Sequence, residues 1–337
     1  MTTVGIVDVA SYAPAAVQKA EEIAALSGIP AAVIRERFGL ESKHIAGADE
    51  HVSDLAARAA GLILARHPEH PLGALIYMGS PYRDFPVWSA GPKVQQLLGP
   101  AAAGALAFDV QGVSAGTPIS LQVAKGLILA NPAIDQVMLA GGSREHDLID
   151  YSNARSRFMF NFGAGAAAVL VRRDHPENLV LETAGFTDGR FADLVMVPAG
   201  GSREPTTADT VAARRHALDV RDPAWMKAEL DPVSAQRFVD VARQAVERSG
   251  YRVSDIAMLC PIHTKRSLFL QILAGLDLRE DQAIYLSDHG HMSALDPLVA
   301  LHRARAEGRL ADGSLVVLLA AGTGYSWAAT AIRWGRA

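Results

Sequence analysis

Short apolar runs alternate with longer amphipathic stretches along the chain. Continuous apolar runs predict strands that are buried on both faces of a sheet, and apolar residues three or four positions apart predict helices packed on it. In the first half, the predicted strands are residues 5–9, 74–78, 106–110, 136–139 and 166–171, and the predicted helices are residues 15–27, 52–65, 88–98 and 117–130. This alternation is typical of an α/β fold.

The second half repeats the same order of elements. Its predicted elements are strand 179–183, helix 232–249, strand 256–259, helix 267–276, strand 283–286, helix 294–307 and strand 314–320. The repeat predicts an internal duplication, with halves at residues 1–173 and 174–337 whose turns meet at one central site. A charged, irregular stretch around residues 200–229 is either an insertion that caps this site or a solvated surface excursion.

Ser114 lies where an apolar strand turns into a helix, within the pentapeptide GVSAG. Gly112 and Gly116 permit a sharp turn with close backbone approach, and Pro118 suits the first helical turn. A hydroxyl at a helix N-terminus faces free N–H groups and the positive end of the helix dipole, which stabilise an oxyanion on an attacked carbonyl. Ser114 is therefore a candidate nucleophile, while the alternative is an ordinary turn or helix N-cap.

A serine nucleophile needs a neighbouring base, which is usually histidine. His263 follows the predicted strand 256–259, and His289 and His291 follow the predicted strand 283–286. These strand ends are where α/β proteins assemble their sites, so these three histidines are the candidate bases. The other eight histidines lie in polar or helical surroundings and are expected at the surface.

Two further motifs resemble metal-binding and phosphate-binding segments but are incomplete. The His-Gly-His segment at residues 289–291 has no HExxH motif or cysteine pair to complete a zinc site, so no metal is expected. The glycine-rich segment at residues 321–326 lacks a P-loop lysine and a full GxGxxG. A tight turn at Thr323 and Gly324 that contributes N–H groups to an oxyanion is the better interpretation.

The composition excludes several other classes. The chain has 32 basic and 36 acidic residues and only 6% aromatic residues, which argues against nucleic acid as a partner. The single cysteine, Cys260, excludes a disulfide framework. Apolar runs such as residues 315–321 are shorter than the roughly 20 residues that span a membrane, and the N-terminus lacks a signal-peptide pattern. We therefore expect a cytoplasmic protein without a membrane partner.

Several blocks together resemble the ketoacyl-ACP synthase III family. The blocks, in family order, are GIVDVASYAP, RERFGLESKHIA, SDLAARAA, FDVQGVSAG, NFGAGAAAVLV, a strand ending in PIH, LSDHGHMSALDPLVAL and GRLADGSLVVLLAAGTGYSWA. The resemblance implies the thiolase fold, an α/β fold of two duplicated halves with a five-layered α-β-α-β-α core. The N-terminal half would carry Ser114, the C-terminal half would carry His263 and His291, and the protein would be a homodimer.

The resemblance also shows where this chain departs from the family. Ser114 replaces the nucleophilic cysteine, His291 replaces the asparagine of a GNTSAA-like motif, and Ala164 replaces the acid of an FGDGAG motif. His263 matches the histidine of an HQAN-like motif, in which Arg266 replaces the asparagine. In condensing members the histidine and asparagine stabilise the enolate that forms when a malonyl thioester loses carbon dioxide, so the change at residue 291 argues against that reaction.

The change from cysteine to serine makes a base more important, because a thiol with a pKa of about 8.5 is partly ionised near neutral pH and a hydroxyl is not. His263 is the preferred base. His291 would orient it, bind the substrate carbonyl or act as the base itself, and Asp296 or Asp288 would fix an imidazole tautomer. Serine-bearing relatives of the family load starter units in aromatic polyketide pathways, and this chain is more similar to those than to the housekeeping condensing enzyme.

The family's coenzyme A site is partly kept. Val33 replaces a tryptophan that stacks on adenine, whereas Arg37 keeps a nearby arginine, and two arginines flank the family's second arginine position at Ser156. The candidate substrate-binding residues are Arg37, Arg155, Arg157, Arg266 and Phe85. An acyl carrier protein bound through its phosphopantetheine arm is therefore as plausible a donor as free acyl-CoA, and no further cofactor is expected.

Three functions remain in competition. The leading one is an acyltransferase of polyketide, fatty-acid or other specialised metabolism that passes an acyl group from a thioester through Ser114 to an oxygen, nitrogen, sulfur or carbon nucleophile. The second is a catalytically degenerate partner subunit of a hetero-oligomeric condensing enzyme. The third is a hydrolase. An α/β-hydrolase would need an HGGG-type segment before Ser114, which is missing, but hydrolysis or carbon–carbon cleavage on the thiolase fold stays open.

Overall fold

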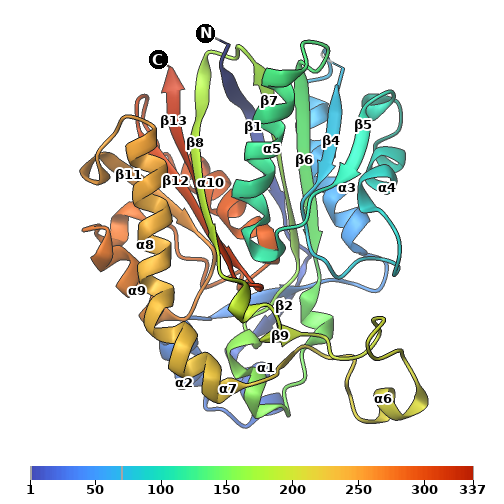
Figure 1. The fold of residues 1–337 in the computed structure, drawn as a ribbon. Coiled ribbons are helices and arrows are strands. Elements are labelled where there is room, and N and C mark those ends of the chain that lie inside the picture. The colour runs from blue at the N-terminus through green and yellow to red at the C-terminus, as the bar shows by residue number, and fades with distance from the viewer. Residues whose placement is uncertain (1, 70, 337) are drawn as a thin grey trace.

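The computed structural model describes residues 2–69 and 71–336. Nine strands of these residues form one mixed sheet in the order β11-β12-β13-β8-β1-β7-β6-β4-β5 (Figure 1). The strands are β1 Val4–Tyr12, β4 Ala74–Tyr77, β5 Leu106–Asp109, β6 Gln136–Ser143, β7 Gly165–Arg173, β8 Glu177–Thr187, β11 Ile256–Pro261, β12 Leu315–Gly322 and β13 Ser326–Arg336. The sheet is continuous because β1 pairs with β8 at Gly5 and Leu179.

The two ends of the sheet repeat one topology. In the first half, β4 is parallel to β5 and β6, and β7 runs antiparallel to β6 and β1. In the second half, β11 is parallel to β12 and to a single bridge at Ala283, and β13 runs antiparallel to β12 and β8. Strands numbered one to five along each half therefore lie in the same order, 3-2-4-5-1, as an internal duplication predicts.

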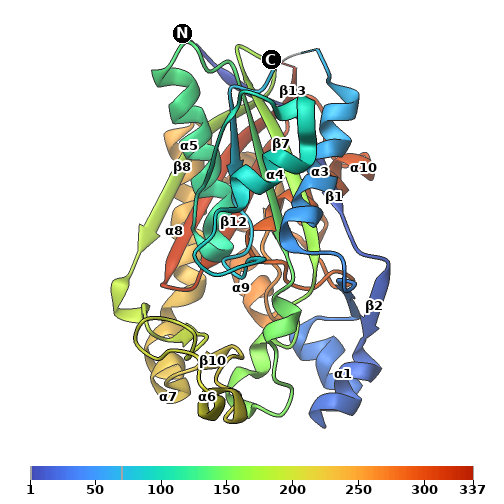
Figure 2. The same ribbon diagram turned by 90° about the vertical axis from the view of Figure 1, so that its right-hand side faces the viewer.

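Helices cover both faces of the two half-sheets. The longer helices are α3 Val52–Arg66, α4 Ala90–Leu98, α5 Gly116–Ala130, α8 Asp231–Arg248, α9 Arg266–Gly275 and α10 Asp296–Ala306. Figures 1 and 2 show α3 and α4 outside the first half, α8 and α9 outside the second, and α5 and α10 between the two, where each contacts strands of both halves. This is the predicted five-layered α-β-α-β-α arrangement.

The strand β12 is apolar at every position because both of its faces are buried. Leu315, Val317 and Leu319 pack in the core beneath α8 and α9, whereas Val316 and Leu318 pack in the core around α5 and α10. Successive side chains of a strand point to opposite faces, so a strand covered on both faces has no polar side.

The helix α5 with the turn before it, residues Val113–Ala130, is long and apolar enough to cross a membrane by length and composition alone. Half of this stretch is buried inside the molecule, and α5 packs between the two half-sheets. These are the properties of a helix in the core of a globular fold.

Smaller elements gather at the end of the sheet opposite the two termini (Figures 1 and 2). They are β2 Ala16–Lys19, β3 Ser42–Ile45, β9 Val195–Met196, β10 Asp219–Val220, α1 Ala20–Ser27, α2 Ala31–Val33, α6 Ala208–Ala212 and α7 Pro223–Trp225. The single helix predicted at residues 15–27 is wrong in its first part, because residues 16–19 pair with β3 as a strand. The strand predicted at residues 283–286 is reduced to the bridge at Ala283.

Candidate active site

The turn before α5 presents Ser114 at the centre of the molecule. Strand β5 ends at Asp109, and residues 113–115 form one 3₁₀ turn that leads into α5. Val113 takes a positive φ of 47°, which is rare for a β-branched residue and marks the turn as strained. A Cβ on Gly116 would lie 2.9 Å from the Met78 carbonyl oxygen, so Gly116 is required by crowding rather than by its own φ.

Ser114 forms a hydrogen-bonded chain with His291 and Asp296. The Ser114 Oγ lies 2.8 Å from His291 Nε2, and His291 Nδ1 lies 2.6 Å from Asp296 Oδ2. A carboxylate only accepts, so Nδ1 carries the imidazole proton and the neutral ring accepts the Ser114 proton at Nε2. This is the arrangement of a serine, histidine and aspartate triad.

Asp296 is held rigidly as the acid of this triad. It is completely buried at the start of α10. Its Oδ2 also accepts the backbone N–H of His263 at 2.8 Å, and its Oδ1 accepts the N–H of Met292 at 2.7 Å. These bonds fix the carboxylate, so the orientation of the His291 ring is fixed with it.

The electrostatic surroundings of His291 favour its protonated form. Burial lowers its pKa, but the charge and hydrogen bond of Asp296, together with the charge of Glu145, outweigh burial and raise the pKa above 6.5. A base with a pKa raised toward neutrality is suited to proton transfer.

His263, which the sequence favours as the base, is not the histidine that binds Ser114. It lines the same cavity as Ser114, but neither ring nitrogen has a hydrogen-bond partner among the described residues. Burial lowers its pKa to about 4, so the ring is neutral at pH 7. The Ser114 hydroxyl donates to His291 instead, because Asp296, five residues after His291, binds the Nδ1 of that ring and directs it.

Asp288, the other predicted orienting acid, does not contact His291 or His263. Its carboxylate binds Arg303 and lies 3.0 Å from His289 Nδ1. It therefore stabilises the outer part of this turn and leaves the orientation of His291 to Asp296.

Ser114, His263 and His291 line an inner cavity of about 360 Å³. Thr323, one of the predicted oxyanion residues, also lines it, and Gly322 packs so tightly on the serine turn that a Cβ there would lie 3.0 Å from the Ser114 nitrogen. Part of the irregular stretch lines the cavity, through Val220 and Met226 among others. Figure 1 shows the other part, around α6, projecting from the molecule.

A second, outer cavity of about 630 Å³ adjoins the inner one through shared residues that include Asn161. Its basic lining residues are Arg37, Arg157, Lys265 and Arg266, and its one acidic lining residue is Glu36. The structure therefore brings three of the predicted substrate-binding arginines to the outer cavity. Arg155 lines the inner cavity and pairs with Asp219, whereas Phe85 is exposed and lines neither cavity.

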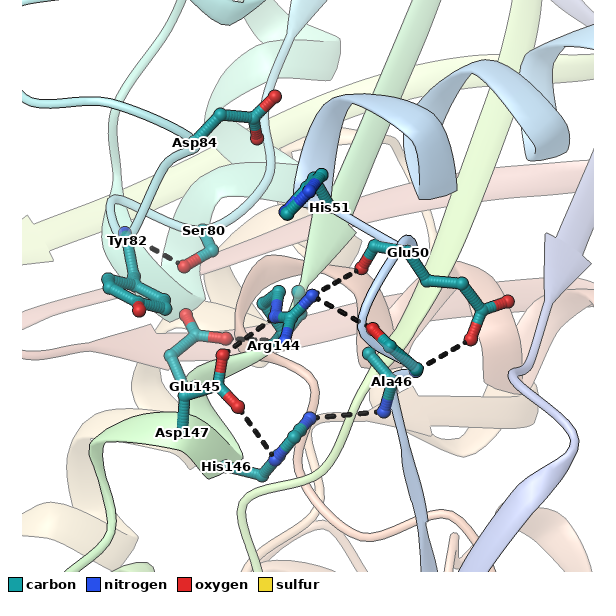
Figure 3. Close-up of polar contacts among 12 residues, drawn as sticks. Ala46, Glu50, His51, Ser80, Tyr82, Asp84, Arg144, Glu145, His146 and Asp147 are labelled. Carbon is teal, nitrogen blue, oxygen red and sulfur yellow. Dashed lines mark hydrogen bonds and ion pairs between the residues drawn. The ribbon is translucent and has the colours of Figure 1, made fainter.

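A polar cluster behind the triad was not predicted from the sequence. Arg144 donates to the carbonyl oxygen of Glu50 at 2.8 Å and to Asp147 at 2.7 Å, and His146 Nε2 accepts the N–H of Ala46 at 3.1 Å (Figure 3). These bonds tie the turn after β6 to the loop before α3. Glu145, in the middle of that turn, is thereby held in a buried position from which its charge reaches His291.

Within residues 2–69 and 71–336, no three histidine, cysteine or acidic side chains are grouped so that they could hold a metal ion.

The profile of the family described as 3-oxoacyl-[acyl-carrier-protein (ACP)] synthase III matches residues 108–189, and the profile of its C-terminal part matches residues 246–334. The chain is 31% identical to the β-ketoacyl-[acyl-carrier-protein] synthase III of Rhodospirillum centenum over 96% of this chain and 97% of the relative. It is 29% identical to the enzyme of the same name from Cereibacter sphaeroides, over 97% of each chain. The crystal structure of 3-oxoacyl-(acyl carrier protein) synthase III from Pseudomonas aeruginosa is 27% identical, covers 98% of each chain and has a TM-score of 0.84.

Proposed function

This chain belongs to the β-ketoacyl-[acyl-carrier-protein] synthase III family of acyltransferases and has its thiolase fold, and from that premise we propose that it forms an acyl-Ser114 intermediate. The acyl group comes from a thioester and passes to an acceptor other than a decarboxylating malonyl group. The observation that carries the proposal is the hydrogen-bonded chain from Ser114 through His291 to Asp296.

In the first step, Ser114 Oγ attacks the thioester carbonyl while His291 Nε2 takes the hydroxyl proton. Asp296 stabilises the imidazolium that forms, and the oxyanion of the tetrahedral intermediate is stabilised by N–H groups at the start of α5 and at the turn of Thr323 and Gly324. As the intermediate collapses, the carbon–sulfur bond breaks and His291 returns the proton to the thiolate. The products are the acyl serine ester and a free thiol.

In the second step, an acceptor takes the place of the thiol. His291 removes its proton as it attacks the ester carbonyl, and then returns that proton to Ser114. His263 is neutral, and neither of its ring nitrogens has a hydrogen-bond partner in the part of the chain that the structure describes, so it donates a hydrogen bond to a substrate oxygen in the inner cavity.

The outer cavity supports a donor with a negatively charged end. Arg37, Arg157 and Lys265 line it, and it leads into the inner cavity that contains Ser114. The names of the relatives include an acyl carrier protein, and a phosphopantetheine arm carries its thioester at one end and a phosphate at the other. Acyl carrier protein and acyl-CoA are both donors of this kind.

One departure from the family supports transfer over decarboxylative condensation. His291 stands where the resemblance expects an asparagine, and its two ring nitrogens are already engaged by Ser114 and Asp296. A completed triad also argues against a degenerate partner subunit, since loss of function would not preserve three hydrogen-bonded groups of matched chemistry. The relatives, which are named as β-ketoacyl-[acyl-carrier-protein] synthases III, together with the serine at position 114, support a place in fatty-acid or polyketide metabolism.

Intact-protein mass spectrometry tests the proposal. The protein is incubated with a series of acyl-CoA and acyl-carrier thioesters, and a mass increase equal to the acyl group is expected on Ser114. The variants Ser114→Ala and His291→Gln should not gain this mass. The absence of any adduct with every thioester tried would contradict the proposal, and an adduct lost to water as fast without acceptors as with them would identify a hydrolase.

A further inference from the structure

Lys43 is a fully buried lysine that no step of the proposed mechanism uses. It lies on β3, its side chain has no exposed surface, and its ammonium packs 5.3 Å from the centre of the Tyr151 ring. Its Nζ donates to the carbonyl oxygen of Phe160 at 2.9 Å and to that of Phe162 at 2.6 Å. Burying a lysine is costly unless its donors are satisfied, so these two bonds are its main support.

The same short segment is bound on its other edge by His291. The carbonyl oxygen of Asn161 accepts the N–H of His291 at 2.9 Å, and the N–H of Gly163 donates to the His291 carbonyl oxygen at 2.9 Å. These bonds make Phe162 and His291 a parallel bridge. The carbonyls of residues 160 and 162 thus bind Lys43, and the carbonyl of residue 161 and the N–H of residue 163 bind His291, so this short segment connects the two residues.

Side chains of this segment also form part of the site. The Phe162 ring contacts the His291 ring edge-on, with centroids 4.8 Å apart. Asn161 and Phe162 both line the inner cavity. A shift of the segment would therefore move the base and a wall of the cavity together.

The stem of Lys43 is enclosed by two glycines. A Cβ added at Gly163 would lie 3.3 Å from Lys43 Cβ, and one added at Gly290 would lie 3.2 Å from it and 2.3 Å from the Asn161 carbonyl oxygen. The lysine stem thus fills the space between the segment of residues 160–163 and the turn that carries His291. Its stem packs against both pieces of backbone, and its two hydrogen bonds hold the first of them.

We propose that Lys43 is a positioning residue for acyl transfer, which fixes residues 160–162 and through them the backbone and ring of His291. This inference rests on the proposed role of His291 as the base. It identifies a residue outside both cavities on which the rate of serine acylation depends.

The hydrogen bonds of Lys43 do not require its charge. Burial lowers its pKa to about 7, but a neutral amine retains two N–H groups, enough for both carbonyls. The role of Lys43 is therefore geometric, and variants test it more directly than pH does.

The test compares Lys43→Met, which keeps the length of the stem but has no donor, with Lys43→Gln, which keeps two N–H donors on a shorter stem. Lys125→Met is the matched control, because Lys125 also donates to a backbone carbonyl, that of Leu181 at 2.6 Å, and lines neither cavity. Each protein is reacted with a fluorophosphonate, which forms a phosphorus–oxygen bond with an activated serine and releases fluoride. Mass spectrometry measures the rate of labelling at Ser114.

We expect Lys43→Met to label about 100-fold more slowly than the native protein, the effect of a misplacement of about 1 Å at a reacting group. Lys43→Gln should be intermediate, and Lys125→Met should match the native protein. Labelling of folded Lys43→Met at the native rate would overturn the inference. If Lys43→Met does not fold, Lys43→Gln decides in the same way.

A spectroscopic measurement separates this inference from the proposed function. The proton between His291 Nδ1 and Asp296 gives a downfield NMR signal, which is assigned by its loss in His291→Gln. Failure of the native protein to label would contradict the activated serine, and the inference would then be judged on this signal alone. A signal that shifts or broadens in Lys43→Gln but not in Lys125→Met supports a positioning role, and an unchanged signal overturns it.

Discussion

The chemistry of Ser114 depends on one imidazole out of the two that face it across the inner cavity. His291 is joined to the buried Asp296 and has a raised pKa, whereas neither ring nitrogen of His263 has a hydrogen-bond partner among the described residues, and burial lowers its pKa to about 4. Two histidines in one cavity thus have opposite tendencies to hold a proton, and this difference assigns the role of base to His291.

The dependence of Ser114 on His291 can be measured by changing the nucleophile. In the native background, His291→Asn should slow acylation by about 10²–10⁴-fold, which is the usual contribution of a general base. In a Ser114→Cys background the same change should cost at least 10-fold less, because a few per cent of a thiol is ionised at pH 7 without help. Rapid-quench mass spectrometry gives the four rates, and an equal loss in both backgrounds would contradict this role.

The rate of acylation should rise with pH as His291 loses its proton, since only the neutral ring accepts a proton from Ser114. The pKa of His291 is raised, so the midpoint is expected above pH 6.5. In Asp296→Asn the main cause of the rise is removed and burial lowers the pKa, so the midpoint should fall while the maximal rate drops by about 10³–10⁴-fold. Fluorophosphonate labelling between pH 5 and 9 checks both changes, with folding followed by circular dichroism. A midpoint that does not move would exclude Asp296 as the cause.

The sequence predicted which residues form this site, but it did not predict the hydrogen bonds between them. Ser114 and His291 contact across 177 positions of sequence, and residues 263 and 291 both follow predicted strands. The ring of His291 binds Asp296, whereas His263 reaches it only through its backbone N–H, and this difference depends on how α10 begins. Nothing in the sequence indicated that Lys43 is buried, because a lysine in a polar segment is expected at the surface.

At the level of elements, the serine turn is held between backbone segments that approach very closely. A Cβ on Gly322, at the end of β12, would lie 2.4 Å from the carbonyl oxygen of Gly112 and 2.9 Å from the nitrogen of Ala115. The prediction of elements from the apolar pattern also fails in one place. Residues 16–19 have an apolar pattern that suits a helix, yet they pair with β3, which no local pattern could indicate.

Gly322→Ala should therefore displace the serine turn. The crowding atoms are backbone, which cannot move aside, so we expect a loss of about 1–3 kcal/mol of folding free energy and strongly reduced labelling of Ser114. Gly126→Ala is the control, since no atom lies within 4 Å of a Cβ at this position on α5. It should stabilise the protein by about 0.5–1 kcal/mol and leave labelling unchanged. Denaturant unfolding and labelling rates check both variants, and a Gly322→Ala protein that labels normally would contradict the expected crowding.

At the level of the whole molecule, the repeated strand order leaves β5 at one end of the sheet. The repeat was predictable because both halves have the same succession of elements. The joining of the two halves into one sheet was not, because it depends on the single pair of Gly5 and Leu179. An edge strand presents unpaired N–H and C=O groups, and Leu106 on β5 is 58% exposed, with Phe85 and Val87 also exposed.

We expect two copies of the chain to pair along β5 about a two-fold axis, in keeping with the homodimer that the family resemblance implies. Light scattering coupled to size-exclusion chromatography should give twice the mass of one chain for the native protein. Leu106→Lys should give the mass of one chain, because lysine opposes pairing at a sheet edge. Leu26→Lys is the control, since Leu26 is 56% exposed on α1. A native protein with the mass of one chain, or a dimeric Leu106→Lys, would contradict this arrangement.

The distance in sequence between Ser114 and His291 has a consequence for synthesis. A ribosome that has completed the first half of the chain has produced the serine but not yet the histidine or Asp296, which follow 177 and more residues later. Until those residues arrive, the serine is an ordinary alcohol that does not react with the thioesters around it. Unfinished or truncated copies therefore do not become acylated, and acylation begins only in a chain whose second half has folded onto its first.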